Sequence, residues 1–214
     1  MKLTTEKINE LLGVDDAYKA PEALMNILLN RDKREIVFNR FLEIEKDLTF
    51  DWFHEYFQEE HADRKQKKQD FTPNSVGKVL SLILDHSEST LDVAAGTGGL
   101  TIKKWWNDGQ PTNNEYLCEE LSDRAVPFLL FNLMIRGMKA QVIHGDSLSG
   151  VTKKVYIISD YELTEINEEL AIEKVDAVIS NPPYSAKWDA SPTLLDDPRF
   201  SHYEKLSLIH ISEP

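Results

Sequence analysis

Apolar residues in the first 70 positions recur every three or four residues, and no stretch there alternates apolar with polar positions. This spacing is typical of amphipathic helices that pack one face against a core. It predicts a capped helix that begins at Thr5, a second that Pro21 opens in its first turn, and a third over residues 36–44. Four aromatic residues then follow at helical spacing and are interpreted as packing residues rather than a base-stacking surface: Trp52, Phe53, Tyr56 and Phe57. Residues 1–70 are therefore expected to form a helical N-terminal region.

The pattern changes after residue 70 to short apolar runs separated by helical segments. Strands are predicted at 91–94, 115–118, 140–144 and 175–180, with helices over 100–106 and 122–137 between them. Pro127 requires the second of these helices to start late or to be kinked. This alternation predicts an α/β fold with a doubly wound, Rossmann-like parallel sheet.

Residues 149–172 interrupt the alternation and suggest no function. Val155–Ile158 is predicted to be an additional strand, and Glu162–Ala171 an acidic helix. A further helix is expected over residues 74–84, where Thr72 or Asn74 could cap it.

A glycine-rich turn, Ala94-Ala-Gly96-Thr-Gly98-Gly, follows the strand that contains Asp92. Glycines let the backbone turn sharply and let a ligand lie against it, at the N-terminus of the next helix. The spacing is not that of the dinucleotide fingerprint, because Ala94 stands where its first glycine would be, and the Lys-Ser/Thr ending of a phosphate-binding loop is missing. The turn is thus expected to hold a ligand other than a dinucleotide, the alternative being a turn for packing only.

Two more strand ends carry acids. Glu120 ends the second predicted strand, where a carboxylate is well placed to accept hydrogen bonds from ribose hydroxyls, although a solvated charge at a helix start is a common alternative. Asp146 follows the third strand. Because the carboxyl ends of parallel strands meet at one edge of a sheet, Asp92, Glu120 and Asp146 are expected on one rim.

The fourth strand ends in Asn181-Pro-Pro-Tyr184. Two prolines fix φ twice and remove two backbone donors, so the strand must stop and a stiff, extended loop must follow. Such a loop presents an amide side chain, freed carbonyl groups and an aromatic ring together. This combination suits the gripping of a flat group that bears an amine.

Charge and composition set the bounds on partners. The formal net charge of -13 argues against a generally basic surface for nucleic acid, and the only cationic run, residues 64–68, fits a local patch or a solvated linker equally well. The single cysteine, Cys118, excludes an internal disulfide and is interpreted as a core residue, and no Cys/His cluster has the spacing of a metal site. No signal peptide or membrane span is evident, so a cytoplasmic protein is expected.

Five features follow one another along the chain: Phe71-Thr-Pro73, Asp92-Val-Ala-Ala-Gly-Thr-Gly-Gly99, Glu120, Asp146 and Asn181-Pro-Pro-Tyr184. Their order resembles that of the corresponding motifs in adenine-specific DNA methyltransferases, including the modification subunits of type I restriction systems. The resemblance covers residues 71–206. It implies S-adenosylmethionine as cofactor, double-stranded DNA with a flipped adenine as substrate, and a DNA-specificity subunit as a candidate partner.

The resemblance also implies roles for single residues. Phe71, Thr72 and Pro73 would contact the methionine portion of the cofactor, while Asp92, Ala94, Gly96 and Gly98 would shape its pocket. Glu120 would bind the ribose hydroxyls and Asp146 the adenine amine. In the catalytic motif, Asn181 and the carbonyl of Pro182 would accept hydrogen bonds from the target amine, Pro183 would stiffen the loop and Tyr184 would stack on the base.

The family pattern is incomplete toward the end of the chain. A methyltransferase sheet of this type has seven strands, and residues 207–214 do not continue the resemblance, which suggests a C-terminally truncated copy. Two alternatives to DNA methylation stay open at this point. One is a methyltransferase that acts on protein glutamine or RNA, and the other is a non-catalytic chain that binds only cofactor or a partner.

Overall fold

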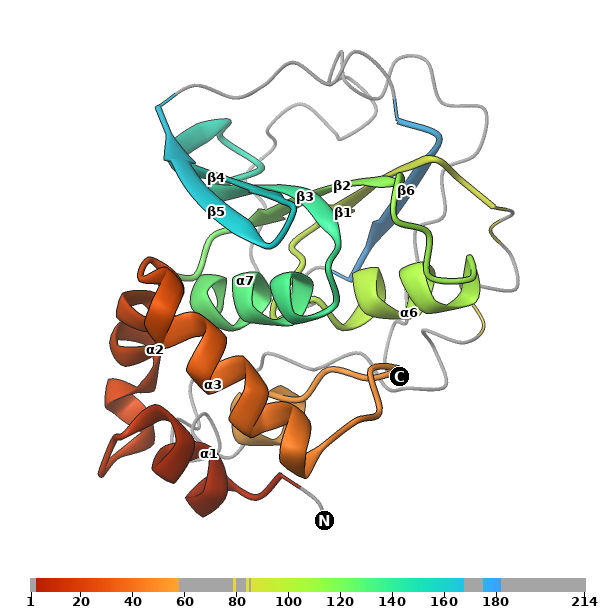
Figure 1. Ribbon diagram of the computed structural model, residues 1–214. Coiled ribbons are helices and arrows are strands. Elements are labelled where there is room, and N and C mark those ends of the chain that lie inside the picture. Colours follow the sequence, from red (N-terminus) through yellow and green to blue (C-terminus); the bar gives the residue numbers. More distant parts are fainter. Residues whose placement is uncertain (1–2, 58–78, 80–83, 85, 168–174, 182–214) are drawn as a thin grey trace, which may run out of the picture.

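The computed structural model describes residues 3–57, 79, 84, 86–167 and 175–181 of the 214-residue chain. In this part of the chain a twisted sheet carries two helices on one face, and the N-terminal helices form a further layer beyond them (Figure 1). The helix expected over residues 74–84 lies outside the described residues, apart from Val79 and Leu84. None of the described helices is long and apolar enough to cross a lipid bilayer.

Three helices build the N-terminal layer and confirm the helical pattern, and two of them begin with a side-chain cap. Helix α1 (Thr5–Leu12) begins where Thr4 Oγ1 accepts a hydrogen bond from the backbone of Lys7, and it ends at Gly13 with a left-handed φ of 70°. A short 3-10 turn, η1 (Ala17–Lys19), leads to α2 (Ala20–Leu28), which has Pro21 in its first turn. Helix α3 (Arg31–Ile44) is capped by the side chain of Asn30.

Six strands form a single sheet in the order β5-β4-β3-β2-β1-β6. Their bounds are β1 (Ser89–Val93), β2 (Glu115–Glu120), β3 (Lys139–Asp146), β4 (Val151–Ser159), β5 (Glu162–Ile166) and β6 (Ala177–Ser180). The neighbours β3, β2, β1 and β6 run parallel, whereas β4 and β5 are antiparallel to their neighbours. The four predicted parallel strands and the additional strand at 155–158 are thus confirmed.

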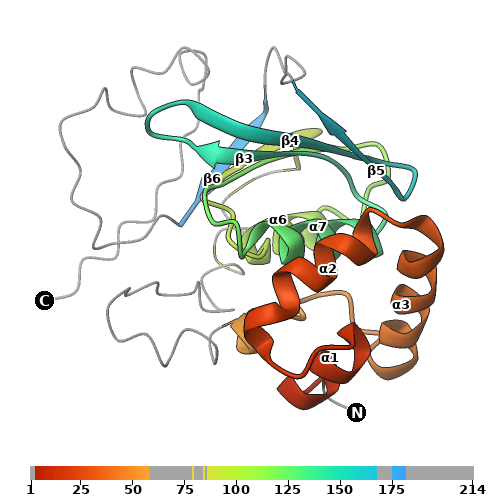
Figure 2. The ribbon, with the colours of Figure 1, turned by 90° about the vertical axis from the view of Figure 1, so that its left-hand side faces the viewer.

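Helices α6 (Gly99–Asn107) and α7 (Val126–Ile135) lie on the same face of the sheet, between it and the N-terminal layer (Figure 2). Helix α7 starts late, with Pro127 in its first turn, so the proline causes no kink. Every residue of α7 is buried, because the sheet covers one side of this helix and the N-terminal helices cover the other.

One large apolar core joins the N-terminal layer to the sheet. The ring centroids of Phe38 and Phe131 are 4.8 Å apart, as are those of Phe53 and Phe128, so rings from the N-terminal region interlock with rings of α7. Trp52, Tyr56 and Phe57 are also buried in this core, and Cys118 lies in it as a buried free thiol. The aromatic residues are therefore packing residues, as predicted.

The segment predicted as an acidic helix over 162–171 is a strand where it is described. Residues 162–166 form β5, which pairs with β4 through a two-residue turn at Asp160 and Tyr161. Both turn residues have positive φ, 51° and 61°, which is the geometry of a type I′ hairpin turn. Pairing with β4 therefore overrides the helical propensity of the glutamates.

Candidate active site

The carboxyl ends of the four parallel strands meet at one edge of the sheet. Val93 of β1 pairs with Glu119 of β2 on one side and with Ser180 of β6 on the other, and Glu120 pairs with His144 of β3. Because the strands lie in the order β3-β2-β1-β6, the candidate residues Asp146, Glu120, the glycine-rich turn and Asn181 follow one another along this edge. Going from β1, the next strands in the chain, β2 and β3, lie on one side of β1, and the later strand β6 lies on the other side. Open α/β sheets bind their ligands at such a switch point.

The glycine-rich turn between β1 and α6 uses backbone conformations that favour glycine. Gly96 has a φ of 59° and Gly98 a φ of 93°, and even Ala94 adopts a left-handed φ of 58°. A Cβ atom on Gly98 would lie 2.8 Å from Cδ1 of Leu129, whereas one on Gly96 would meet no atom of the described residues within 4 Å. The left-handed φ of Gly98 and the closeness of Leu129 on α7 thus both favour glycine at position 98, whereas no atom of the described residues crowds Gly96.

The carboxylate of Glu120 ties this turn to the end of β2. Its Oε2 accepts a hydrogen bond of 2.7 Å from the backbone N–H of Gly96, and its Oε1 accepts one of 2.8 Å from Ser122. Burial raises the pKa of Glu120, and these backbone hydrogen bonds partly oppose that rise. Each carboxylate oxygen can accept a second hydrogen bond, so Glu120 still has acceptor capacity for a ligand.

Asp92 is the most deeply buried acid of the predicted set, with 1% of its surface exposed. Its Oδ2 accepts a hydrogen bond of 2.5 Å from Oγ1 of Thr101, while its Oδ1 has no partner among the described residues. Burial raises the pKa of Asp92 to about 7, although the Thr101 hydrogen bond works in the opposite direction. Among the described residues, Oδ1 of Asp92 is thus a buried acceptor that no hydrogen bond uses, which is rare in proteins.

Asp146 lies at the same edge, but its oxygens hold its own loop. They accept hydrogen bonds of 3.0 Å from the backbone of Leu148 and 2.9 Å from Oγ of Ser149, and these bonds lower the pKa of Asp146. The preceding Gly145 lies where the pairing of β3 with β4 shifts register, and a Cβ there would approach the carbonyl oxygen of Val151 to 2.5 Å. The register shift thus positions Asp146 at the rim.

Asn181 directly follows β6 and is half-buried. The neighbouring Ser180 donates a 2.7 Å hydrogen bond from its hydroxyl to the carbonyl oxygen of Val93, which fixes the end of β6 against the start of the glycine-rich turn. The first residue of the predicted catalytic motif therefore lies on the strand next to the predicted cofactor turn. The remaining predicted residues lie outside the described residues: Phe71, Thr72, Pro73, Pro182, Pro183 and Tyr184.

Three polar residues at or near the glycine-rich turn are not among the site residues that the sequence predicts. Thr97, Asp51 and Asn132 form one buried hydrogen-bonded group, with Thr97 in the turn, Asp51 after α3 and Asn132 on α7. Asp51 and Asn132 give no sequence signal, because only the packing of distant elements brings them to the turn. Thr97 could have been noticed as the polar residue between two glycines.

The comparisons with known proteins agree with this architecture. Residues 45–209 match the N-6 DNA Methylase family. The chain is 25% identical over 201 residues to the methylase subunit of the type I restriction enzyme MjaVIII from Methanocaldococcus jannaschii, covering 86% of this chain and 32% of that protein. A solved structure, the type I restriction-modification system methyltransferase subunit from Streptococcus thermophilus, superimposes with a TM-score of 0.50 at 22% identity.

The superposition covers 95% of this chain and 49% of the solved chain, and it supports the fold. The chain thus spans about a third of the length of the curated relative and about half of the solved one. The family match, by contrast, extends over well more than half of the chain. With its α/β sheet, its glycine-rich turn and the Asn181 strand end in place, the chain belongs to the N-6 DNA methylase family.

Proposed function

We propose that this site transfers a methyl group from S-adenosylmethionine to the exocyclic amine of adenine in DNA. The observation that carries the proposal is the order of groups along the carboxyl edge, where acids suited to a nucleoside lie on β3 and β2 and Asn181 follows β6. Membership of the N-6 DNA methylase family supports DNA as the substrate.

The residues at the edge fit such a cofactor. Glu120 has acceptor capacity for ribose hydroxyls, Asp146 is a carboxylate suited to an adenine amine, and among the described residues none crowds Gly96. Leu121, which follows Glu120, is 54% exposed and offers an apolar surface for a flat ring. When bound, S-adenosylmethionine supplies an electrophilic methyl group on a sulfonium.

The catalytic work assigned to the chain is positioning. An amine conjugated into a ring is a poor nucleophile, and acceptors at the Asn181 side chain and the Pro182 carbonyl would pull it toward tetrahedral geometry with its lone pair free. A base inside a duplex must be flipped out to reach this edge, at a cost of about a few kcal/mol. Stacking on Tyr184 would recover about 1–3 kcal/mol of that cost.

Charge supports a role for a second component in binding DNA. A net charge of -13 repels a polyanion, so we propose that a DNA-specificity subunit supplies much of the contact with the duplex. The two relatives are themselves named as methylase or methyltransferase subunits of type I systems. We place this activity in the cytoplasm.

Calorimetry with S-adenosylmethionine tests the cofactor site. Wild-type protein should bind, and Glu120→Ala should weaken binding at least about tenfold, because a charged hydrogen-bond acceptor is worth about 1.5–3 kcal/mol. Glu115→Ala is the matched control, since Glu115 begins the same strand, is exposed and lies at the opposite edge of the sheet. Absence of binding by the wild type would refute the cofactor assignment.

A second experiment tests the chemistry with labelled S-adenosylmethionine and duplex DNA, in the presence of a type I specificity subunit. Asn181→Ala should abolish labelling of DNA but keep cofactor binding. Label found only in protein or RNA would instead favour a glutamine or RNA methyltransferase. A variant that matches the wild type in every property would favour a non-catalytic chain.

A further inference from the structure

We propose that Asp51, in the N-terminal region, is a positioning residue for the glycine-rich turn and thereby sets the affinity for the methyl donor. The proposal rests on the proposed function, because it names the group that holds the cofactor turn in shape. It assigns to the N-terminal region a role at the site beyond covering the core.

The carboxylate of Asp51 is buried, with 8% of the residue exposed, and both of its oxygens are used. Oδ2 accepts a hydrogen bond from the hydroxyl of Thr97, and Oδ1 accepts bonds of 2.7 Å from Nδ2 of Asn132 and 2.9 Å from the backbone of Phe53. Thr97 lies between Gly96 and Gly98, so this carboxylate reaches the middle of the turn.

Asn132 completes the hold on Thr97 from the other side. Its Nδ2 also donates a 2.9 Å hydrogen bond to the backbone carbonyl of Thr97, so both the hydroxyl and the carbonyl of Thr97 are fixed. Thr97 is 4% exposed and Asn132 is fully buried, which makes a water molecule a poor replacement for either partner. The turn therefore has little freedom to adopt another conformation.

Arg136 fixes the loop that carries Asp51. Its guanidinium donates to the backbone carbonyls of Leu48 and Phe50, and also to the backbone and side-chain oxygens of Asn132 at 2.6 and 3.0 Å. Burial lowers the pKa of Arg136 to about 10, so it stays positively charged at neutral pH and offsets the charge of Asp51. Arg136, Asn132 and Asp51 thus form one continuous polar group that ends on the turn.

The conformation that this group holds is the one that matters for the ligand. Gly96 and Gly98 both have left-handed φ, and the N–H of Gly96 points at Glu120, the residue assigned to the ribose. A turn without the Asp51 contact can relax, because glycine populates other conformations at little cost. Relaxation would misplace the Gly96 amide and Glu120 together.

The test uses the full chain and compares Asp51→Ala with Asp51→Asn and Arg34→Met. Calorimetry should show S-adenosylmethionine affinity weakened at least about tenfold in Asp51→Ala, the loss expected for one hydrogen bond to a charged group. The affinity of Asp51→Asn for S-adenosylmethionine should stay within about threefold of the wild-type value. Its amide oxygen accepts from Asn132, and its amide N–H donates to the hydroxyl of Thr97, which can also accept a hydrogen bond. Arg34→Met removes a buried side chain of the same helical region that bonds to Leu28 and the β4–β5 hairpin, and the affinity of this variant for S-adenosylmethionine should equal that of the wild type.

Hydrogen exchange in the ligand-free protein gives a readout that does not depend on the cofactor. Amides 96–101 should exchange at least about tenfold faster in Asp51→Ala than in wild type, while those of β3 keep their rate. Unchanged exchange in the turn, or affinity that falls equally in Arg34→Met, would overturn the proposal.

A second variant serves if Asp51→Ala does not fold. Thr97→Val keeps the side-chain shape without the hydroxyl, and the same changes in affinity and exchange are expected for it. If the wild type binds no S-adenosylmethionine, the proposed function fails and exchange alone decides the role of Asp51.

Discussion

The carboxyl group of Asp92 is buried in the folded protein. The free energy of unfolding therefore depends on whether Asp92 is protonated. Its folded pKa of about 7 lies above the value of about 3.9 for an exposed aspartate. The proton is therefore bound more tightly in the folded state. The resulting stabilisation is complete below about pH 4 and is lost as the pH rises through 7.

Asp92→Asn should remove this pH dependence. Its amide oxygen still accepts from Thr101, but the side chain no longer ionises. Between pH 4.5 and 8.5 the free energy of unfolding of the wild type should fall relative to the variant, by at most about 1.4 kcal/mol per pH unit. Urea denaturation at several pH values measures this difference. Parallel curves for the two proteins would show that Asp92 does not titrate in this range.

Single site residues could be predicted from the sequence where position along a strand determines their place. Asp92, Glu120 and Asp146 each lie at or near the end of an apolar run, so a parallel sheet must bring them to one edge. Asp51 could not be predicted, because its contact with Thr97 spans 46 residues and depends on the packing of α7. Sequence spacing carries no information about a contact of that kind.

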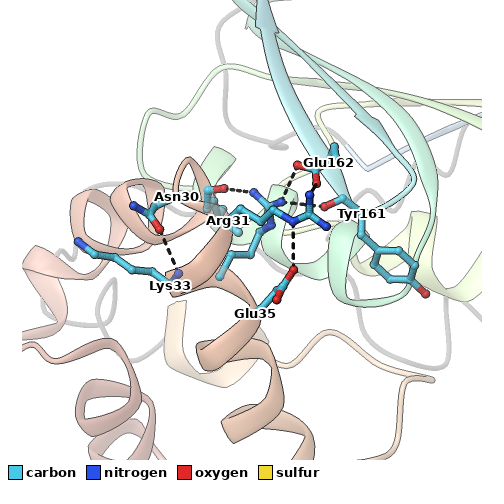
Figure 3. Close-up of polar contacts among 8 residues, drawn as sticks. Asn30, Arg31, Lys33, Glu35, Tyr161 and Glu162 are labelled. Atoms are coloured by element: carbon cyan, nitrogen blue, oxygen red, sulfur yellow. Dashed lines mark hydrogen bonds and ion pairs between the residues drawn. The ribbon is translucent and has the colours of Figure 1, made fainter.

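At the scale of elements, the contact between α3 and the β4–β5 hairpin links the N-terminal layer to the sheet. Arg34 on α3 donates to the carbonyl of Leu28, to the carbonyl of Tyr161 at the hairpin turn and to the carboxylate of Glu162. Figure 3 shows Tyr161 and Glu162 of the hairpin facing Arg31 of α3. The side chain of Arg34 is 5% exposed, whereas that of the neighbouring Arg31, which also pairs with Glu162, is 69% exposed. The two arginines are thus expected to contribute differently to the free energy of unfolding.

Arg34→Met should lower the free energy of unfolding by about 1–3 kcal/mol, because it removes the donor that the buried carbonyl of Leu28 and the part-buried carbonyl of Tyr161 share. Arg31→Met is the control, and it should change stability by less than about 0.5 kcal/mol, since water screens an exposed ion pair. Chemical denaturation of the two variants beside the wild type measures both values. Equal losses would mean that the burial of Arg34 contributes nothing.

The same contact explains why the local sequence does not indicate the turn before β5, a segment whose glutamates favour a helix. A type I′ turn usually contains Asn-Gly or Asp-Gly, but here Asp160 and Tyr161 adopt the two positive φ values. Arg34 holds the carbonyl of Tyr161, and the Tyr161 ring lies so close to Gly137 that a Cβ there would be 2.6 Å from the hydroxyl. Because tertiary contacts rather than local residues stabilise this turn, the local sequence did not predict it.

At the scale of the whole molecule, the N-terminal helices and the sheet share one apolar core instead of two. Phe131 of α7 contacts Phe38, Phe41 and Phe53 of the N-terminal region. The helical layer and the α7 face of the sheet should therefore unfold together. The alternation of strands and helices predicted the α/β sheet correctly, but periodicity within each segment could not show that the helices would pack on α7.

Hydrogen exchange at increasing urea concentration tests this cooperativity. Amides of α3 and β2 should open with the same free energy, while those of the edge strand β5 should open earlier. Exchange of α1 to α3 at clearly lower urea than β2 would instead show that the N-terminal layer unfolds as a separate unit.

The order of strands also sets a length. Neighbouring strands lie about 4.8 Å apart, so the three steps from β3 to β6 separate the Asp146 end of the edge from the Asn181 end by roughly 14 Å. Under the proposed function two molecules share this length: the methyl donor would extend from Asp146 toward the glycine-rich turn, and the target base would lie at Asn181. The spacing of the strands therefore sets how far the methyl donor would have to reach for its methyl group to meet the target amine.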